Sequence, residues 1–326
     1  MVKNQKVKAK SEKFSSRSRV KSSSPKKSLE KKNLVRVFVA GGSRNGNNPI
    51  YVKQAYELGK EIGKHDYQLT FGLSSRGIMG AVAKGVLESW NQKPHKKHKP
   101  IEGVTTTDYL KRYDTEKELA AIADIVVSKT LEERKRHMLE AEFVIFTPGG
   151  VGTLDELAFD CVAMQDGLLQ KKPFVLFNTD GFFHHLLEFL KDIHLKGFAD
   201  FVPFIVVDNV YEASVAFDMI RYRYSLKKSK NINMEETIER IEYDLPYVLQ
   251  EKQKNPQKTT RQILNEIKHT FSGQGDAVKY ALTQAIETAY LKKETGRMHD
   301  RLEKTGRDMA LVNHKLASLK QRKNKG

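Results

Sequence analysis

One short stretch of the sequence combines glycines, a hydroxyl and two carboxylates at spacings that suit phosphate and sugar chemistry. Residues 146–157 read FTPGGVGTLDEL, after an apolar run typical of a strand and before a pattern typical of a helix. A helix that begins after a strand offers unpaired N–H groups and the positive end of its dipole, which favour an anion. Glycine lets the backbone approach a phosphate without a Cβ clash. The stretch therefore predicts a phosphate-binding loop.

Within this loop, the anion-binding groups precede the acids. The three glycines and the hydroxyl that suit a phosphate are Gly149, Gly150, Gly152 and Thr153. Asp155 and Glu156 follow, and we expect them in the first turn of the helix. Carboxylates are favoured there by the helix dipole alone. On composition, a structural role and a catalytic role are therefore both open for each acid.

The loop matches neither of the common nucleotide fingerprints. It lacks the Lys-Ser/Thr ending of a P-loop, and its glycines do not follow the first strand as those of GxGxxG would. The segment TLEERKRHML, residues 130–139, immediately precedes the strand that leads into the loop. It brings Arg134 and Lys135 into the same region, where a guanidinium can contact a carboxylate or a phosphate bidentately.

The elements that position these residues alternate along the chain. Strand-like apolar runs occur at 34–40, 67–72, 101–106, 124–128, 142–147, 173–178 and 204–208, with helical patterns between most of them. This alternation predicts a Rossmann-like α/β fold, a doubly wound parallel sheet with helices on both faces. Ligands of such sheets lie at the carboxyl ends of the strands, where the glycine loop is expected.

Composition divides the chain into three parts. Residues 1–33 are rich in Lys and Ser and are expected to form a disordered basic tail. The Rossmann-like domain is expected over 34–226, and a mostly helical basic extension over 227–326, broken at Pro246, Pro256 and Gly273/Gly275. Within this extension, apolar residues form a short heptad-like stripe, Leu302, Met309, Val312, Leu316 and Leu319.

The net charge of +17 belongs to the two ends of the chain. Residues 1–33 hold 12 Lys/Arg against 2 acids, and residues 227–326 hold 21 against 13, whereas the middle part is almost neutral. The basic tails are therefore the only part of the chain whose charge admits nucleic-acid contact, and a solvated tail without such contact is the alternative. The single cysteine, Cys161, cannot form an internal disulfide. No membrane span and no secretory signal are evident, so we expect a cytoplasmic protein that does not enter a membrane.

Several motifs in order resemble those of one family. ERKRHM followed by FTPGGVGTLDEL resembles the paired RK…M and PGGxGTxxE motifs of the Lonely Guy (LOG) family, phosphoribohydrolases that cleave the N-glycosidic bond of nucleoside 5′-monophosphates. Residues 37–62, 76–86 and 176–190 resemble its first strand with serine loop and helix, its GLMG helix start and the segment after its sixth strand. The resemblance covers residues 34–210. The family is also described as possible lysine decarboxylases, but no pyridoxal-phosphate lysine motif is apparent.

The resemblance implies a nucleosidase that hydrolyses AMP or a cytokinin-type nucleotide to free base and ribose 5-phosphate. It implies that Glu156 and Arg134 are catalytic and that the glycines with Thr153 hold the 5′-phosphate. The further substrate contacts that we expect are Gly42, Ser43, Lys135, Met138 and Asp155. A carboxylate such as Glu156 can stabilise the positive charge that develops on the ribose. The resemblance implies no metal or other cofactor, and it implies a homodimer or a larger homo-oligomer.

One departure from the family keeps a second function open. The family has a run of three glycines before the GLMG segment, whereas Leu73 and Ser74 stand there in this chain, followed by Ser75 and Arg76. Side chains in this loop would narrow the nucleotide site or change which base it accepts. The alternative is a non-catalytic nucleotide-binding module or scaffold whose basic tails contact nucleic acid or a protein partner. The presence of both Arg134 and Glu156 favours the enzyme.

Overall fold

The computed structural model describes residues 34–92, 98–112, 119, 122–168, 172–200, 204–227 and 234–323. The predicted tail, residues 1–33, lies outside these ranges. None of the described helices combines the length and the apolar content that crossing a membrane requires.

The core is a seven-stranded parallel sheet, which confirms the Rossmann-like α/β prediction. The strands lie in the order β4-β3-β2-β1-β5-β6-β7. Their bounds are β1 Arg36–Ala40, β2 Gln68–Phe71, β3 Ile101–Thr106, β4 Ala123–Ser128, β5 Phe143–Phe146, β6 Phe174–Phe177 and β7 Ile205–Val207. The chain adds strands on one side of β1 up to β4 and then returns to place β5 on its other side. A reversal of this kind is the switch point of a doubly wound sheet. Ligands of such sheets bind outside the carboxyl ends of the two strands beside it, here β1 and β5, a place that we call the crevice.

The sheet is apolar on both faces because helices cover both. In β1, Val37 and Val39 belong to one buried cluster, whereas Phe38 and Ala40 belong to the other. This alternation is the period of two that a strand imposes on its side chains. A sheet buried on both faces needs strands without a polar side, which is why the strand runs read as continuous apolar segments.

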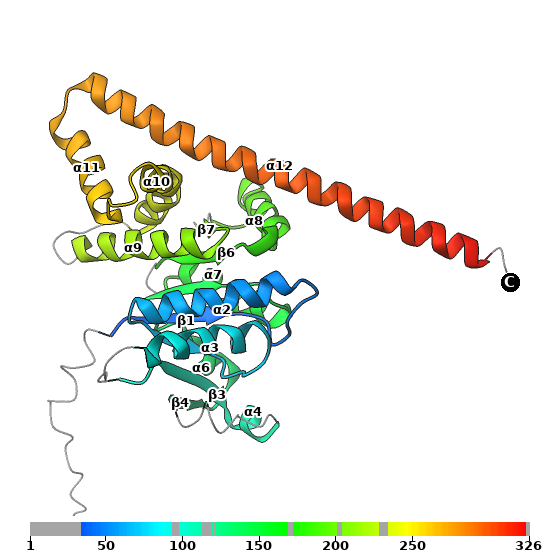
Figure 1. Cartoon of the computed structure of the whole chain (residues 1–326). Helices are drawn as coiled ribbons and strands as arrows, with labels where there is room; N and C mark the ends of the chain where they lie inside the picture. The colour runs from blue at the N-terminus through cyan, green and yellow to red at the C-terminus, as the bar shows by residue number, and fades with distance from the viewer. Residues whose placement is uncertain are drawn as a thin grey trace, which may run out of the picture. The chain divides into compact units, whose positions relative to one another are not determined.

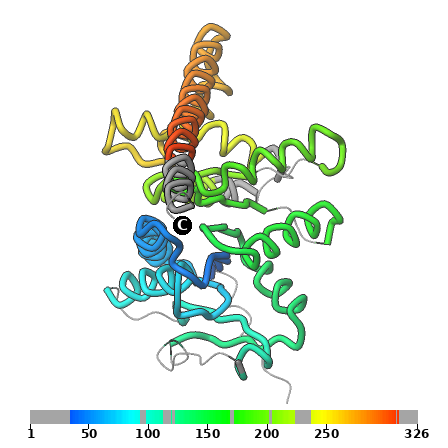
Figure 2. The backbone as a smooth tube through the Cα atoms, turned by 90° about the vertical axis from the view of Figure 1, so that its right-hand side faces the viewer, coloured from blue at the N-terminus to red at the C-terminus, as the bar shows by residue number. Residues whose placement is uncertain are grey.

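The helices divide between the two faces, as Figure 2 shows. The first cluster receives side chains from α2 (Pro49–Lys64), α3 (Gly77–Asn91) and α9 (Val210–Lys227). The second receives them from α6 (Leu131–Met138), α7 (Val151–Gln165) and α8 (His184–Leu195). Short α4 (Thr107–Arg112) follows β3, and a 3-10 turn, η2 (Thr179–Gly181), follows β6. Cys161 is buried in the second cluster, as expected of a small apolar residue.

Three further helices complete the described chain: α10 (Met234–Lys254), α11 (Thr260–Gly273) and α12 (Asp276–Lys323), which Figure 1 traces as one continuous helix. Beyond Tyr224 the described residues form no strand, in agreement with the sequence. Ile241, Leu245 and Ile263 join the cluster that covers the first face of the sheet. The extension thus shares a core with the sheet, while its assignment as a separate unit stays a prediction.

The predicted helix breaks were right at two of three places. Helix α10 ends at Lys254, before Pro256, and α11 ends at Gly273. The break predicted at Pro246 is wrong, because Pro246 lies inside α10. Proline in a helix interior costs about 3 kcal/mol through its missing N–H and its ring clash. Leu245 and Val248, fully buried on either side of it, hold the helix together by tertiary packing that outweighs this cost.

Candidate active site

Two loops meet at the crevice between the carboxyl ends of β1 and β5. The Thr147 backbone N–H and side-chain hydroxyl both donate to the Ala40 carbonyl, at 2.9 and 2.8 Å. The Gly42 N–H donates to the Pro148 carbonyl at 3.1 Å. The predicted contact residue Gly42 is therefore tied directly to the predicted phosphate loop. Ser43 follows it as an exposed residue on the same rim.

Glycine is required where these loops touch. A Cβ on Gly149 would lie 2.6 Å from the Thr153 Cβ and 3.0 Å from the Gly42 nitrogen, both too close. By contrast, a Cβ on Gly150 or Gly152 would meet no atom within 4 Å. Gly149 therefore serves the packing of the loop, whereas Gly150 and Gly152 border open space that a ligand can enter.

The first turn of α7 faces this open space with unpaired donors. Gly150 is the N-cap residue, and no side chain caps the helix. The first N–H groups of a helix have no partner within it, so those of Val151, Gly152 and Thr153 are available to an anion. Thr153 is buried in the turn. This geometry is the one that the sequence predicts for phosphate binding.

The two acids lie deeper in the helix than we expected. Helix α7 begins at Val151 and has no acidic residue in its first turn. Asp155 and Glu156 are its fifth and sixth residues, so the prediction that they enter the first turn is wrong. Because the helix begins directly after Gly150, the acids fall into the second turn. The helix dipole acts mainly within the first turn. It therefore does little to explain why carboxylates stand at these two positions.

Arg134 is fixed beside Glu156 by contacts from several elements. Its Nε donates to the Val104 carbonyl of β3 at 2.9 Å, and the side chain is nearly buried. Its Nη1 lies 3.7 Å from the Glu156 Oε1, an ion pair too long for a hydrogen bond. The guanidinium also lies 5.6 Å from the centre of the Tyr109 ring. The predicted catalytic pair is thus brought together, with the arginine held from behind.

Gly72 and Tyr109 are contacts of Arg134 that sequence reasoning missed. A Cβ on Gly72 would collide with the Arg134 guanidinium, so a bare backbone after β2 makes room for this side chain. Helix α4 supplies Tyr109 beside the same guanidinium. A glycine directly after a strand was the available signal for Gly72, whereas nothing in the sequence marks Tyr109.

Burial shifts the pKa of the Glu156 carboxyl group toward neutral pH. Desolvation raises its pKa to about 7, against the opposing effect of Arg134, and the neighbouring charge of Asp155 adds to the rise. Lys135 lowers it slightly. A carboxyl group with a pKa near 7 can gain or lose a proton at working pH, which is the property of a general acid or base.

Lys135 and Met138 take positions different from that of Arg134. The Lys135 Nζ lies 2.7 Å from an oxygen of Asp155, on the exposed side of α7. Met138 is fully buried in the second core cluster, where it packs α6 onto the sheet. Its contact with the substrate stays a prediction, and one that this burial does not favour.

The loop that departs from the family pattern has a glycine-like backbone. Leu73 has a φ of 60°, a conformation that glycine adopts at no cost. Its side chain is buried in the first core cluster, against Gly103, where a Cβ would clash with it. The Leu73 side chain thus fills the core instead of the nucleotide crevice. Ser74 accepts a hydrogen bond from the Arg76 N–H at 3.3 Å and closes the turn that leads into α3.

No three His, Cys, Asp or Glu side chains of the described ranges are grouped in a way that could hold a metal ion.

Comparison with known proteins identifies the family. A family model described as possible lysine decarboxylase matches residues 79–213. The chain is 31% identical over 180 residues to a probable cytokinin riboside 5′-monophosphate phosphoribohydrolase of Oryza sativa subsp. japonica, covering 54% of this chain and 73% of that protein. It is 32% identical over 172 residues to a cytokinin riboside 5′-monophosphate phosphoribohydrolase of Arabidopsis thaliana, covering 52% and 72%.

Among solved structures, the molybdenum cofactor carrier protein of Chlamydomonas reinhardtii is similar at 22% identity and a TM-score of 0.43, over 59% of this chain and 99% of that chain. A likeness at this level bears on neither ligand nor activity. The sequence relatives, each matched over more than two thirds of its length, carry the assignment. The chain belongs to the Lonely Guy (LOG) family of phosphoribohydrolases.

Proposed function

We propose that this protein hydrolyses the N-glycosidic bond of a purine nucleoside 5′-monophosphate, AMP or a cytokinin-type nucleotide, to free base and ribose 5-phosphate. The observation that carries the proposal is the nearly buried Arg134–Glu156 pair, 3.7 Å apart, beside an uncapped glycine-rich helix start at the crevice of the sheet. A binding module needs the helix start but has no evident need of the pair.

The geometry supports the following roles. The 5′-phosphate accepts hydrogen bonds from the N–H groups of α7 at Gly152 and Thr153 and borders the open space at Gly150. This places the ribose toward the second turn of the helix, where Glu156 lies. Departure of the base leaves positive charge on the ribose, which the ionised Glu156 carboxylate stabilises. The same carboxylate accepts a proton from the attacking water, and the departing base takes up one proton from solvent. The bond from C1′ to the base nitrogen thus breaks as the bond from C1′ to the water oxygen forms, and the carboxylate is deprotonated again when the products leave.

Arg134 acts on this carboxylate and on the substrate. Its charge favours the ionised form of Glu156 against burial, and its remaining donors can orient the substrate. The nearby Lys135–Asp155 pair lies on the exposed side of the same helix and borders the site. Gly42 and Ser43 supply the opposite rim. No metal or other cofactor enters the proposal.

Assembly and location are part of the same proposal. Helix α7 exposes Val151, Leu154 and Val162, apolar side chains that a second copy of the LOG domain would cover in a homodimer. We place the enzyme in the cytoplasm, in keeping with its single buried cysteine. Nucleic-acid contact would be confined to the basic tails.

A product assay tests the proposal. Purified protein is incubated with AMP, GMP, IMP, CMP, UMP and a cytokinin nucleotide, and free base and ribose 5-phosphate are separated by chromatography. Base release that Glu156→Gln abolishes is expected. Asp166→Asn, which neutralises an exposed acid at the end of the same helix, is the matched control and should keep full activity. Nucleotide binding without base release from any substrate would contradict hydrolysis and favour the non-catalytic module.

A further inference from the structure

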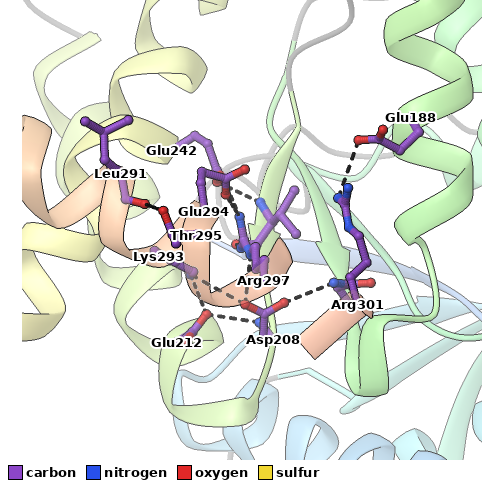
Figure 3. A network of polar contacts seen from close by, with 12 residues as sticks. Glu188, Asp208, Glu212, Glu242, Leu291, Lys293, Glu294, Thr295, Arg297 and Arg301 are labelled. Atoms are coloured by element: carbon purple, nitrogen blue, oxygen red, sulfur yellow. Dashed lines mark hydrogen bonds and ion pairs between the residues drawn. The ribbon is translucent and has the colours of Figure 1, made fainter. Parts of the chain in front are cut away.

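Helix α12 turns its charged face toward the rest of the protein. Figure 3 shows Lys293 and Arg297 among the carboxylates of Asp208, Glu212 and Glu242. The Arg297 Nε lies 3.0 Å from an Asp208 oxygen, and its Nη2 donates to the Val206 carbonyl at 2.7 Å. The Lys293 Nζ lies 2.6 Å from a Glu212 oxygen. This face anchors the helix to the end of β7 and to α9 and α10.

Two more contacts continue the anchor toward the carboxyl edge of the sheet. The Arg301 Nη2 lies 3.4 Å from a Glu188 oxygen of α8. The Lys304 Nζ donates to the Asp180 carbonyl at 2.6 Å. For the described side chains, Lys304 is the last residue of α12 with such a contact, although the helix continues to Lys323.

The opposite face of α12 is apolar and uncovered. Leu291, Met298, Leu302 and Met309 are between 54% and 68% exposed. In a helix anchored by packing, large apolar residues normally face the core. Before Leu291, Ile286 and Ala289 of α12 are buried, but beyond them ionic residues hold the helix inward, so the apolar residues from Leu291 onward point outward. A long helix that makes few contacts gains little from propensity alone and normally needs a packed apolar face.

The exposed residues follow a heptad pattern. With Leu302 and Met309 at position a, Leu291 and Met298 occupy position d. The sequence continues the register with Leu316 at a and with Val312 and Leu319 at d, and threonines stand at the two remaining positions, 295 and 305. Heptads with apolar a and d positions are typical of helices that pair in a coiled coil. We name this face, from Leu291 to Leu319, the α12 seam.

We propose that the α12 seam pairs with the same seam of a second copy of this chain, as an antiparallel coiled coil. Charges at the flanking g positions select this occupant and this direction. When Leu302 faces Thr305 of the second copy, Arg301 falls beside Asp308 and Glu294 beside Lys315, and the two-fold axis repeats both pairs. Every g–g contact of this alignment joins opposite charges. A parallel pair would instead place Lys315 beside Lys320, a repulsive contact.

Arg301 can take part without leaving its present contact. Its ion pair with Glu188 uses Nη2, and 31% of the Arg301 side chain is exposed, so a partner helix can reach the guanidinium. The anchored face of each helix lies away from its seam, so each copy keeps its own core on the outer side of the pair. A two-fold contact of this kind is isologous and closed, which limits growth into filaments.

Sedimentation velocity of the full chain over a wide range of protein concentration tests the pairing. Leu302→Glu with Met309→Glu puts four like charges into each paired seam and should halve the mass of the assembly. The matched control is Val278→Glu with Tyr280→Glu, exposed apolar residues of the same helix outside the seam, which should leave the mass unchanged. If the LOG domains of the same two copies also paired, they would keep the mass unchanged, so both variants are measured in a Leu154→Glu background, which puts a charge on the exposed apolar face of α7. In that background, an unchanged mass in the seam variant, or a chain with an intact seam that is already monomeric, would overturn the proposal.

Two further variants test the direction. Arg301→Glu should dissociate the pair, and adding Asp308→Arg should restore it, since the swap rebuilds the opposite charges. A Met298→Cys chain mixed with a differently tagged Met309→Cys chain should form a mixed disulfide. Cross-links only between identical Met298→Cys chains would mean a parallel pair and overturn the antiparallel one. Neither readout depends on catalytic activity, so failure here leaves the proposed hydrolysis untouched.

Discussion

Two adjacent carboxylates on one helix have different environments, and this difference organises the site at the scale of single residues. Asp155 is exposed and paired with Lys135 at 2.7 Å. Glu156 is nearly buried, and desolvation raises its pKa to about 7. Environments that separate the behaviour of two neighbouring acids commonly assign them different roles. Here Glu156 is suited to proton transfer, whereas the charge of Asp155 adjusts the pKa of Glu156.

The pH dependence of the rate should report Glu156. If its ionised form stabilises the ribose cation, kcat should fall as the pH drops through about 7. Asp155 raises this pKa, so Asp155→Asn should move the acidic limb of the profile to lower pH. The substrate phosphate, with a second pKa of about 6, would produce a limb that the substitution does not move. A pH–kcat profile of both proteins therefore separates the two, and an identical limb would exclude Glu156 as its source.

The raised pKa of Glu156 also predicts how the stability of the protein depends on pH. The folded pKa of about 7 lies above the ordinary value of 4.5, so the folded state binds the proton more tightly than the unfolded state. Stability from this group is full below pH 4.5 and is lost as the pH rises toward 7. Glutamine has no charge to bury, so the Glu156→Gln protein does not lose this stability. Between pH 5 and pH 8 its free energy of unfolding should rise by about 2 to 3 kcal/mol relative to that of the unmodified protein. Urea unfolding at pH 5 and pH 8 measures it, and an equal difference at both would contradict the assignment.

For single residues, the sequence predicted which side chains lie at the site better than it predicted the contacts around them. The glycine loop was identifiable from its residue types and their order, whereas Arg134 and Glu156 were singled out by the resemblance to the LOG motifs, and their catalytic role stays a prediction. Met138 belongs to the same motif, yet it packs in the core. Tyr109 was not identifiable, because it reaches Arg134 from a short helix on another strand connection. Contacts of this kind depend on tertiary packing, which no local pattern records.

At the scale of elements, the loop between β2 and α3 combines an unfavourable backbone with a favourable side chain. Leu73 at φ 60° costs about 1 to 2 kcal/mol, and burying its side chain offsets this by about 2 to 3 kcal/mol. Leu73→Gly loses the burial but relieves the backbone, whereas Leu73→Ala loses the burial and keeps the strain. We therefore expect Ala to be less stable than Gly by about 1 kcal/mol.

Chemical denaturation of both Leu73 variants checks this order. The reverse order is normal wherever φ is negative, because glycine loses more backbone entropy on folding. Ala83 of α3, buried at a regular helical position, provides the comparison site, where Ala83→Gly should lower the stability by about 1 kcal/mol. An alanine at position 73 that is more stable than glycine would show that the loop relaxes to a negative φ.

Elements were predictable where periodicity and turn chemistry agree. All seven strands and the helix ends near Pro256 and Gly273 followed from apolar runs and from breaker residues. The helix does not break at Pro246 as expected, because the burial of Leu245 and Val248 stabilises it by more than the proline destabilises it. The start of α7 was also displaced by local detail: the helix begins directly after Gly150 and so carries the acids into its second turn.

At the scale of the whole molecule, the C-terminal extension reaches the rim of the site. Lys304 of α12 contacts Asp180, whose carboxylate accepts from Asn48 and from the Tyr51 hydroxyl, both at 3.4 Å. Asn48 caps α2, and the loop before it carries Gly42 and Ser43. The extension is thus connected to one wall of the nucleotide crevice through a short chain of polar contacts. Sequence reasoning could place neither these contacts nor their direction, because they join residues 124 positions apart or more.

The anchor of α12 should depend on one arginine. Arg297 is almost enclosed and contacts Asp208, Glu242 and Glu294, at 3.0, 3.4 and 2.6 Å. Burial raises the pKa of Glu242, so this acid depends on a cation beside it. Arg297→Gln removes that cation and leaves the largely buried Glu242 without its ion-pair partner, a defect that costs about 3 to 5 kcal/mol in a buried pair. The cost should appear as loosening of α12, because the strands near the site do not use this arginine.

Hydrogen exchange resolves where that free energy is lost. In the Arg297→Gln protein, the amides of α12 before Lys304 should exchange faster, while those of β1 and β5 keep their protection. Arg307→Gln is the matched control: it removes an exposed arginine of the same helix whose partner is Glu303 at 3.6 Å, a surface pair worth less than about 1 kcal/mol. Equal loss of protection in α12 and in the central strands would mean that the extension and the sheet unfold as one unit. The anchor would then be a part of the fold itself, and α12 could not separate from the catalytic domain without unfolding it.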